Sequence, residues 1–230
     1  MKCAIMQPTY LPWSGYFNLI KNVDYFVFLD DVQFNKRSWQ QRNRILQNGE
    51  ELILSVPVFT KNRSKQKIYE VIINDDINWK KQHLKSLEFS YQKSKYFSEI
   101  MPIIFEIYSF ETISLAEFNI NLIKIIAKAL NIESKFILSK EINSSTHKSQ
   151  HLLDICNSLK CDSYLSPTGS KDYIDSEALF EDNPIMIEYQ KYNPKPYTQL
   201  NSGEFHSHLS IIDVLFNIGI ENTKAYINDY

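Results

Sequence analysis

Few side chains in this sequence are suited to proton transfer, and two adjacent carboxylates stand out among them. Asp30 and Asp31 follow an aromatic and apolar stretch, and the end of a buried strand is a usual position for functional groups in α/β proteins. Asp31 and His83 can each accept a proton from a reacting amine, so we take both as candidate catalytic residues. Asp31 can instead pair with Arg37 or Arg42 in a solvated loop. A lone histidine such as His83 is more often solvated or structural than catalytic.

A polar and aromatic loop follows the first apolar run of the chain. The run Cys3–Met6 leads into residues 7–16, and apolar periodicity at Phe17, Leu19 and Ile20 indicates a helix directly afterwards. Strand, tight loop and helix N-terminus often form a ligand site, because the N–H groups at a helix end are unpaired. Large amphipathic side chains favour a binding loop over a merely buried one. The binding candidates here are Gln7, Pro8, Tyr10, Trp13 and Gly15.

A second loop of similar character follows the apolar stretch 162–166. If this stretch and the first run are neighbouring strands, their loops face each other at the carboxyl edge of a sheet, where α/β proteins bind ligands. Hydroxyls, backbone N–H groups near a glycine and a lysine suit a phosphate or diphosphate. The candidates in this loop are Ser166, Gly169, Lys171 and Tyr173. The remaining substrate-binding candidates are Asp30, Gln33, Lys36, Trp39, Arg42, Asn43, His147, Lys148, Tyr197 and Gln199.

Several familiar motifs are absent from the sequence. It has no P-loop and no Gly-x-Gly-x-x-Gly, and no Gly-x-Ser-x-Gly elbow marks a nucleophilic serine. His206 and His208 lack a nearby carboxylate or cysteine that completes a metal set. Cys3, Cys156 and Cys161 lack metal spacing and are expected to be reduced and structural. We therefore expect neither a metal nor a cofactor.

Strand and helix patterns alternate at both ends of the chain. Apolar stretches at 3–6, 24–29, 136–138, 162–166 and 185–189 predict strands, and helices are expected after most of them. A last helix over 210–219 has Ser as N-cap and Gly at its end. This order predicts an α/β fold with an open, mostly parallel, Rossmann-like doubly wound sheet.

The middle of the chain interrupts this alternation. Residues 51–58 and 67–73 are rich in β-formers and predict a β-hairpin extension that joins them across a polar loop. Helical patterns over 78–90, 96–108 and 114–130 form a helical insertion of approximately 76–130. Without a linker, repeat or composition break, residues 1–230 are expected to form a single α/β domain.

Composition and charge limit the classes of binding partner that we expect. The 230 residues are 43% hydrophobic and 23% charged, with a net charge of −2, so we expect no extended nucleic-acid surface. No signal peptide and no run long enough to span a membrane is visible, which predicts a cytoplasmic protein without a membrane partner. A homodimer is left open.

Several segments together resemble the WbqC-like family. They are Met-Gln-Pro-Thr-Tyr-Leu-Pro-Trp-x-Gly-Tyr-Phe (6–17), Leu-Asp-Asp-Val-Gln-Phe (29–34), Arg-Ser-Trp-Gln-x-Arg-Asn-Arg-Ile (37–45), Val-Pro-Val (56–58), Tyr-Leu-Ser…Gly…Tyr-Ile-Asp (164–175), Tyr-x-Gln-Leu (197–200) and Leu-Ser-Ile-Ile-Asp-Val-Leu-Phe-Asn-x-Gly (209–219). The resemblance covers essentially the whole chain. It implies a bacterial protein associated with gene clusters for O-antigen (lipopolysaccharide) and other surface polysaccharides, often beside enzymes that make amino sugars. The loop 166–170 is less glycine-rich than that pattern.

These observations predict an acyl- or aminoacyltransferase that acts on a nucleotide-linked amino sugar, with an acyl or aminoacyl donor as second substrate. One alternative is a non-catalytic nucleotide- or sugar-binding partner of a polysaccharide-assembly enzyme. The other is a degenerate nucleotidyltransferase, because the turn at 8–15 faintly resembles adenylate-forming and nucleotidyl-transferring α/β proteins. Trp13-Ser-Gly-Tyr16 stands where their His-x-Gly-His signature lies, so both histidines that stabilise charge in that transfer are absent.

Overall fold

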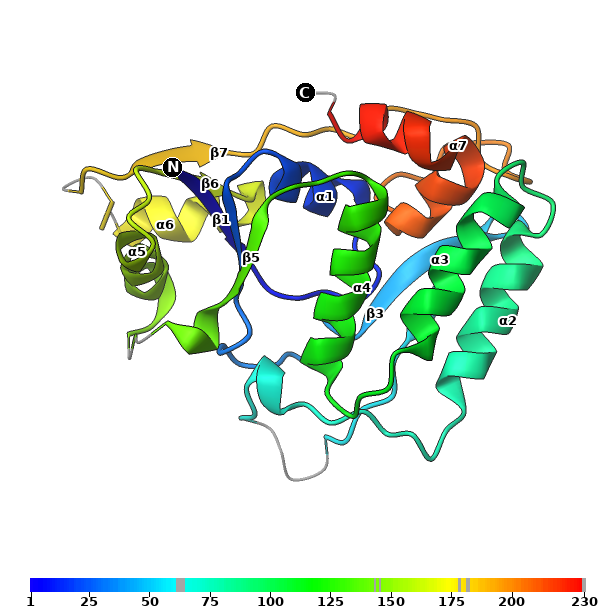
Figure 1. Cartoon of the computed structure of the whole chain (residues 1–230), viewed down its shortest axis with the longest axis horizontal. Helices are drawn as coiled ribbons and strands as arrows, with labels where there is room; N and C mark the ends of the chain where they lie inside the picture. Colours follow the sequence, from blue (N-terminus) through cyan, green and yellow to red (C-terminus); the bar gives the residue numbers. More distant parts are fainter. Residues whose placement is uncertain (61–64, 143, 145, 178, 181–182, 229–230) are drawn as a thin grey trace.

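The computed structural model describes residues 1–60, 65–142, 144, 146–177, 179–180 and 183–228. Among these, five strands form a wholly parallel sheet in the order β5–β2–β1–β6–β7 (Figure 1). The strands are β1 (Lys2–Met6), β2 (Tyr25–Phe28), β5 (Lys135–Leu138), β6 (Ser163–Ser166) and β7 (Met186–Tyr189). The order reverses direction between β1 and β6, which gives an open doubly wound sheet with its switch point there. The predicted α/β fold is confirmed.

Helices cover both faces of this sheet. Successive residues of the central strands therefore belong to two different core clusters, one on each face. Ala4 and Phe26 belong to a large core cluster that includes residues of α1 (Ser14–Lys21) and α4 (Leu115–Ala129). Cys3 and Val27 belong to a second cluster with residues of α5 (Lys148–Ser158) and α6 (Lys171–Glu177). The near-continuous apolar character of β1 and β2 follows from this burial on both faces.

The hairpin extension exists, but its strands differ from the predicted pair, of which Val58 and Ile73 form an isolated antiparallel bridge. The antiparallel pair joins β3 (Arg42–Gln47) to β4 (Glu50–Ser55), with register Arg42 to Ser55. Asn48 and Gly49 connect the strands at φ values of 51° and 82°, the left-handed conformation that a tight two-residue turn requires. The predicted partner 67–73 instead contains a 3₁₀ turn, Ile68–Glu70. The Asn48-Gly49 pair favours a two-residue turn, and this local preference outweighs the β-propensity of residues 67–73.

The helical insertion is formed by α2 (Trp79–Tyr91), α3 (Phe97–Ser109) and α4. Their apolar faces contribute to the large core cluster on the α1 side of the sheet, together with α7 (Ile211–Tyr226) (Figure 1). Whether the whole chain folds as one domain stays a prediction. No helix in the described ranges is both long and apolar enough to cross a membrane.

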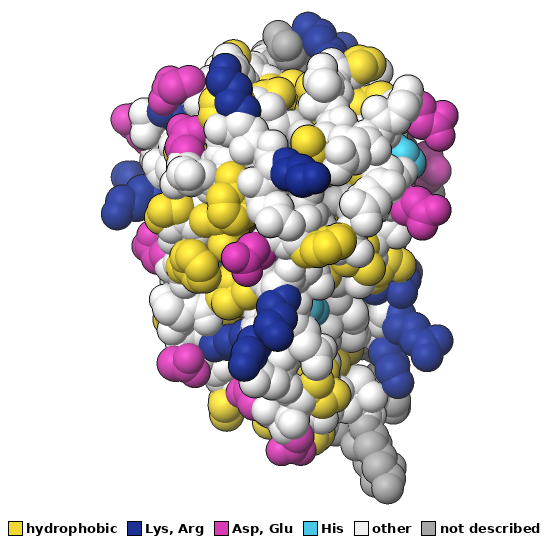
Figure 2. Space-filling view, turned by 90° about the vertical axis from the view of Figure 1, so that its right-hand side faces the viewer, with side chains coloured by type: hydrophobic (Ala, Val, Ile, Leu, Met, Phe, Trp, Pro, Cys, Tyr) yellow, Lys and Arg dark blue, Asp and Glu magenta, His cyan; other side chains and the backbone are white. Residues whose placement is uncertain are grey.

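The face that carries α2 and α3 has a mixed surface. Figure 2 shows Lys and Arg side chains interspersed with Asp and Glu, and apolar patches between them. Exposed aromatic side chains include Phe89 on α2 and Phe105 on α3. Single exposed apolar residues of this kind are normal on soluble proteins.

Candidate functional site

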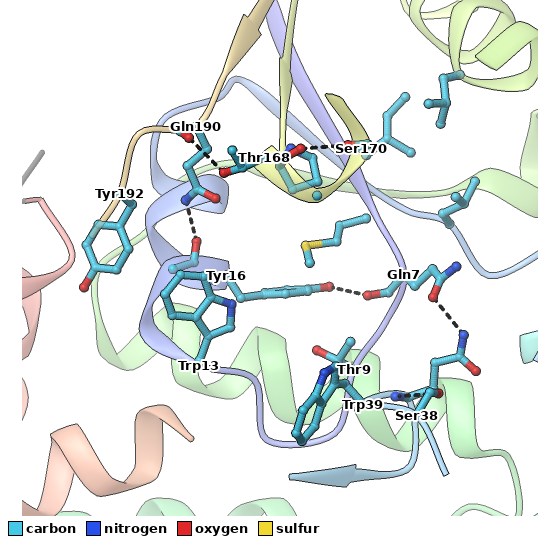
Figure 3. A pocket seen from close by; sticks show the side chains of 18 of the residues that line it. Gln7, Thr9, Trp13, Tyr16, Ser38, Trp39, Thr168, Ser170, Gln190 and Tyr192 are labelled. Carbon is cyan, nitrogen blue, oxygen red and sulfur yellow. Dashed lines mark hydrogen bonds between the residues drawn. The ribbon is translucent and has the colours of Figure 1, made fainter. Parts of the chain in front are cut away.

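A cavity of about 460 Å³ lies at the switch point of the sheet, outside the carboxyl ends of β1 and β6. Its walls come from the loop after β1, the loop 167–170 after β6, the residues after β7, and the segment 35–40 (Figure 3). We call this cavity the switch-point crevice. β1 and β6 pair directly, with Lys2 opposite Ser163, so the two loops predicted to face each other do so.

Aromatic side chains form much of the crevice wall. Tyr16 donates from its hydroxyl to the Gln7 carbonyl at 3.0 Å, which ties the start of α1 to the loop before it. Trp13 contacts the ring of Tyr192, with centroids 5.7 Å apart. Trp39 is half exposed at 50%, although it lines the crevice, so its indole is accessible to a ligand. The crevice therefore offers flat apolar faces.

Amide and hydroxyl groups complete the lining. Gln40 donates to the Gln7 side-chain oxygen at 2.8 Å, and both residues line the crevice. On the opposite side, Gln190 donates to the Gly15 carbonyl at 2.7 Å, and Thr168 donates to the Gln190 carbonyl at 3.1 Å (Figure 3). These groups are held by the fold and can orient a polar ligand.

Charge is what the crevice lacks. None of the described residues that line it is Asp, Glu, Lys, Arg or His. The N-terminus of α1, where this fold often binds phosphate, is covered by an indole: a Cβ on Gly15 would lie 2.2 Å from the Trp13 ring. The predicted phosphate site, which involves the loop after β6 with Gly169 and Lys171, stays a prediction.

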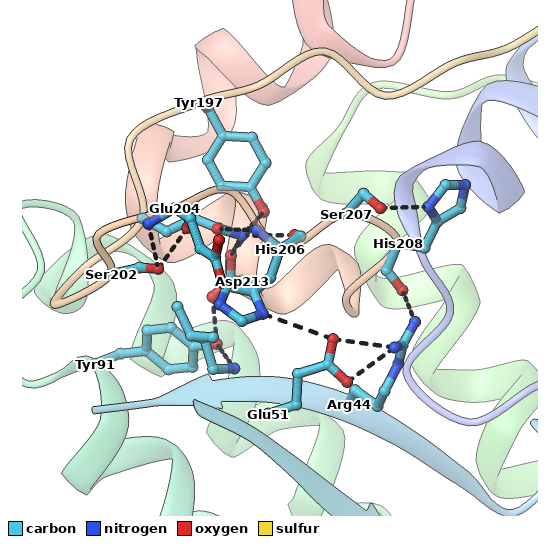
Figure 4. Close-up of polar contacts among 12 residues, drawn as sticks. Arg44, Glu51, Tyr91, Tyr197, Ser202, Glu204, His206, Ser207, His208 and Asp213 are labelled. Atoms are coloured by element: carbon cyan, nitrogen blue, oxygen red, sulfur yellow. Dashed lines mark hydrogen bonds and ion pairs between the residues drawn. The ribbon is translucent and has the colours of Figure 1, made fainter. Parts of the chain in front are cut away.

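A smaller cavity of about 280 Å³ continues the crevice toward β3. The two cavities share Met6, Thr9, Trp13, Tyr16 and Trp39 in their linings. At its far side stand Arg44 and His208, and His208 lies against Trp13 at 4.8 Å between centroids. Arg44 also binds Glu51 through both carboxylate oxygens, at 3.0 and 2.8 Å (Figure 4). The guanidinium at the end of the smaller cavity is thus already paired with a carboxylate.

The structure brings five of the predicted binding residues into the crevice lining: Gln7, Trp13, Gly15, Trp39 and Gly169. Asn43 lines the smaller cavity and holds the loop by donating to the carbonyls of Tyr10 and Leu11. Ser166 is buried beside the crevice, where its hydroxyl lies 2.8 Å from that of Ser170.

Two candidates lie in the core instead. Tyr10 is fully buried, and its hydroxyl contacts His83 Nδ1 at 2.7 Å and the hydroxyl of Tyr108. Burial lowers the pKa of His83 to about 4, so this histidine is neutral at pH 7. Neither residue lines either cavity, so the structure does not bring them together with the crevice residues. Pro8 is also buried, and its carbonyl accepts from Asn119.

A separate network surrounds the buried carboxylate of Asp213 (Figure 4). It accepts from Tyr91 at 2.7 Å, from Tyr197 at 2.6 Å and from Gln199 at 3.1 Å. Burial raises the pKa of Asp213, against the effect of these donors. The predicted ligands Tyr197 and Gln199 are thus occupied in stabilising α7.

The remaining candidates lie on the surface or at other strand ends. Exposed side chains are Gln33, Lys36, His147, Lys148 and Lys171, while Arg42 is half-buried. Lys148 pairs with Glu177 at 3.6 Å, and the Lys171 ammonium lies 5.5 Å from the Tyr189 ring centre. The side chain of Tyr173 lies outside the described part of the structure.

Asp30 and Asp31 do lie at the carboxyl end of β2, as predicted. Burial raises the pKa of Asp30, whose carboxylate accepts from Ser139 and pairs with Lys140 at 3.6 Å. Asp31 pairs with His151 of α5 at 3.0 Å, not with an arginine. Sequence reasoning missed His151, Gln40, Gln190 and Tyr192, because each gains its role from a partner far away in the chain. Among the described residues, no cluster of His, Cys, Asp and Glu is placed to hold a metal ion.

Fold and site define a doubly wound α/β protein with an uncharged, aromatic crevice at its switch point. The chain belongs to the WbqC-like protein family, whose model matches residues 7–225. It is 36% identical over 222 residues to the uncharacterized protein Rv1507c from Mycobacterium tuberculosis (strain ATCC 25618 / H37Rv), covering 96% of this chain and 95% of that protein. No solved structure shows a significant match.

Proposed function

We propose that the switch-point crevice binds the sugar of a nucleotide-linked amino sugar, and that the protein transfers an acyl or aminoacyl group to the sugar amine during synthesis of a bacterial surface polysaccharide. The observation that carries this proposal is the lining: aromatic faces with amide and hydroxyl groups and no charged side chain. Such walls suit a neutral sugar ring, which has apolar faces and hydroxyls at its edge. The family's association with polysaccharide gene clusters supports the same substrate class.

The smaller cavity supports an orientation for the ligand. A sugar in the switch-point crevice would leave its diphosphate outside that space, since no described residue of the lining carries a positive charge. The contiguous cavity leads to the His208 ring and to Arg44, whose guanidinium can donate to a diphosphate beside its bonds to Glu51. Trp39 lines both cavities and would contact the ligand at their junction.

A thermal-shift screen with UDP-, dTDP- and GDP-linked amino sugars tests this proposal, with each free nucleotide alongside. We expect at least one nucleotide sugar to stabilise the protein more than its nucleotide; a ligand at 100 times its Kd adds about 2.7 kcal/mol. Trp39→Ala should weaken binding about tenfold to a hundredfold, or about 1.4–2.7 kcal/mol. Phe89→Ala is the matched control, because Phe89 is 56% exposed against 50% for Trp39 but lines neither cavity. No stabilisation by any nucleotide sugar, or equal loss in both variants, would contradict the proposal.

The same lining also favours a second candidate function, a sugar-binding protein without catalysis. No described residue of the crevice wall carries a carboxylate, imidazole or ammonium that can move a proton at neutral pH. Mixing the nucleotide sugar that binds with acyl thioesters and aminoacyl esters distinguishes the two. Binding without any acylated product favours this second function, and appearance of an amide on the sugar excludes it.

A further inference from the structure

A hydroxyl, an imidazole and a carboxylate form a hydrogen-bonded chain between the end of β2 and the start of α5. Ser144 Oγ lies 2.9 Å from His151 Nδ1. His151 Nε2 lies 3.0 Å from the Asp31 carboxylate. Asp31 follows β2, His151 is in the first turns of α5, and Ser144 precedes that helix. Nucleophile-to-base and base-to-carboxylate contacts of this length are the geometric signature of an activated serine.

The groups around Asp31 determine which atom donates and which accepts in these hydrogen bonds. Its side chain is 12% exposed and that of His151 is 4% exposed. Burial opposes ionisation of Asp31, but hydrogen bonds from His151 and Ser139 together hold its pKa below the ordinary value. An ionised Asp31 accepts the Nε2 proton of His151. The other ring nitrogen, Nδ1, is then free to accept the proton of Ser144.

Ser144 has a second acceptor within reach, the carboxylate of Asp154 at 3.0 Å. Both oxygens of that carboxylate have other donors. Thr146 donates to Oδ2 at 2.6 Å, and Gln150 donates to Oδ1 at 2.9 Å. Asp154 therefore keeps a donor at each oxygen when the Ser144 hydroxyl turns from it to His151 Nδ1. The Thr146 hydroxyl, 2.9 Å from Ser144 Oγ, is a further neighbour of that proton. Ser144 is also partly exposed, so a reagent can reach it.

Two sequence neighbours of this hydrogen-bonded chain line the crevice: Leu152, next to His151, and Leu29, two residues before Asp31. Ser144, His151 and Asp31 themselves line neither the crevice nor the smaller cavity.

We propose that Ser144, His151 and Asp31 form a nucleophilic triad that takes up the acyl group of a thioester or activated ester and passes it to the amine of the sugar. The second half rests on the proposed function, whereas the first half, acylation of Ser144, does not require the sugar.

The transfer takes place in two steps, acylation of Ser144 and attack by the sugar amine. His151 Nδ1 accepts the Ser144 proton while Oγ forms a bond to the acyl carbon; the carbon–sulfur or carbon–oxygen bond of the donor breaks, and the leaving group takes that proton. The sugar amine then attacks the Ser144 ester and gives its proton to His151. The nitrogen–carbon bond forms, the ester bond breaks, and Oγ recovers a proton. Asp31 acts as a positioning residue that fixes the tautomer of His151.

The test uses 4-nitrophenyl acetate as the activated ester and the full chain. We expect a rapid release of one nitrophenolate per protein and one acetyl group, placed on Ser144 by peptide mass spectrometry. Ser144→Ala should abolish both. His151→Asn should slow the release about 10²- to 10⁴-fold. Ser144→Cys, which keeps a nucleophile of similar size, should give a thioester that hydroxylamine removes, and it serves if the alanine variant does not fold.

The chain offers a matched control in Ser207, whose hydroxyl lies 2.9 Å from His208 Nδ1 on the surface. No carboxylate is shown bonded to His208 in the described part of the chain, so this pair lacks the third member. Ser207→Ala should leave the release unchanged. For Asp31→Asn, ¹⁵N NMR of the His151 ring should report a change of tautomer beside the slower release.

An unchanged release in Ser144→Ala, an acetyl group on another residue, or no adduct in the unmodified protein would each overturn the triad. Sugar-nucleotide binding measured on Ser144→Ala separates this result from the proposed function. Loss of acylation with intact binding would leave the crevice proposal standing, and acylation without any sugar-nucleotide binding would leave only the triad.

Discussion

Asp31 and Asp213 are both carboxylates withdrawn from bulk water, yet they differ in the kind of partner that surrounds them. Asp213 is fully buried among neutral donors, the hydroxyls of Tyr91 and Tyr197 and an amide of Gln199. Asp31 lies at the edge of the sheet and binds an imidazole that can itself gain or lose a proton. Neutral donors hold a buried carboxylate in one arrangement and so stabilise the fold. An ionisable partner can exchange a proton with its surroundings, so the carboxylate bound to it can take part in proton transfer.

The largest expected difference between these two regions is in stability. Asp213→Ala leaves two tyrosine hydroxyls and an amide buried without their acceptor, and should lower the free energy of unfolding by about 3 kcal/mol. Asp31→Asn keeps an oxygen in place at the sheet edge and should lower it by about 1 kcal/mol. Urea denaturation measures both. Equal losses would show that the two carboxylates play the same structural role.

Asp31 and Asp213 should make the free energy of unfolding change with pH in opposite directions. The lowered pKa of Asp31 contributes stability above the ordinary carboxyl pKa of about 4, and this is lost as the pH falls through the folded value. Asp213 has a raised pKa, so its folded state binds the proton more tightly and stability falls as the pH rises above about 4 toward the folded value.

Denaturation across the acidic pH range tests whether these two effects on stability have opposite signs. The proteins compared are the unmodified protein, Asp31→Asn and Asp213→Asn. The stability lost in Asp31→Asn should shrink on acidification. For Asp213→Asn, the loss should grow on acidification. Curves with the same sign for both variants would contradict the assigned environments.

The smallest expected effect comes from single donors of the Asp213 network. Tyr197→Phe removes one side-chain donor and should lower the free energy of unfolding by about 1 kcal/mol, because Tyr91 and Gln199 still bind the carboxylate. Tyr197 lines neither the crevice nor the smaller cavity, so ligand affinity should stay unchanged. A variant with intact stability but weaker ligand binding would move Tyr197 from the structural network to the binding site.

The sequence predicted what depends on local pattern and sheet order. The apolar stretches became the five parallel strands, and the loops after β1 and β6 do meet. The sequence could not show which way each side chain of a loop points. Trp13 lines the crevice, whereas Tyr10, three residues earlier, is buried in the core. Backbone conformation decides that difference, since Leu11 between them has a φ of 43°. The partner of Asp31 was also hidden, because His151 is 120 residues away.

Gly15 offers the most direct test of the claim that the switch-point crevice is the ligand site. Its missing Cβ is the space that the Trp13 indole occupies, so Gly15→Ala must push the ring out of its place in the wall while α1 remains helical. Calorimetric titration of the stabilising nucleotide sugar into the unmodified protein and into Gly15→Ala compares the two directly. We expect binding to Gly15→Ala to be weaker by about tenfold or more, equal to about 1.4 kcal/mol, in a variant that is still folded. Equal affinity in the two proteins would contradict it and place the ligand elsewhere.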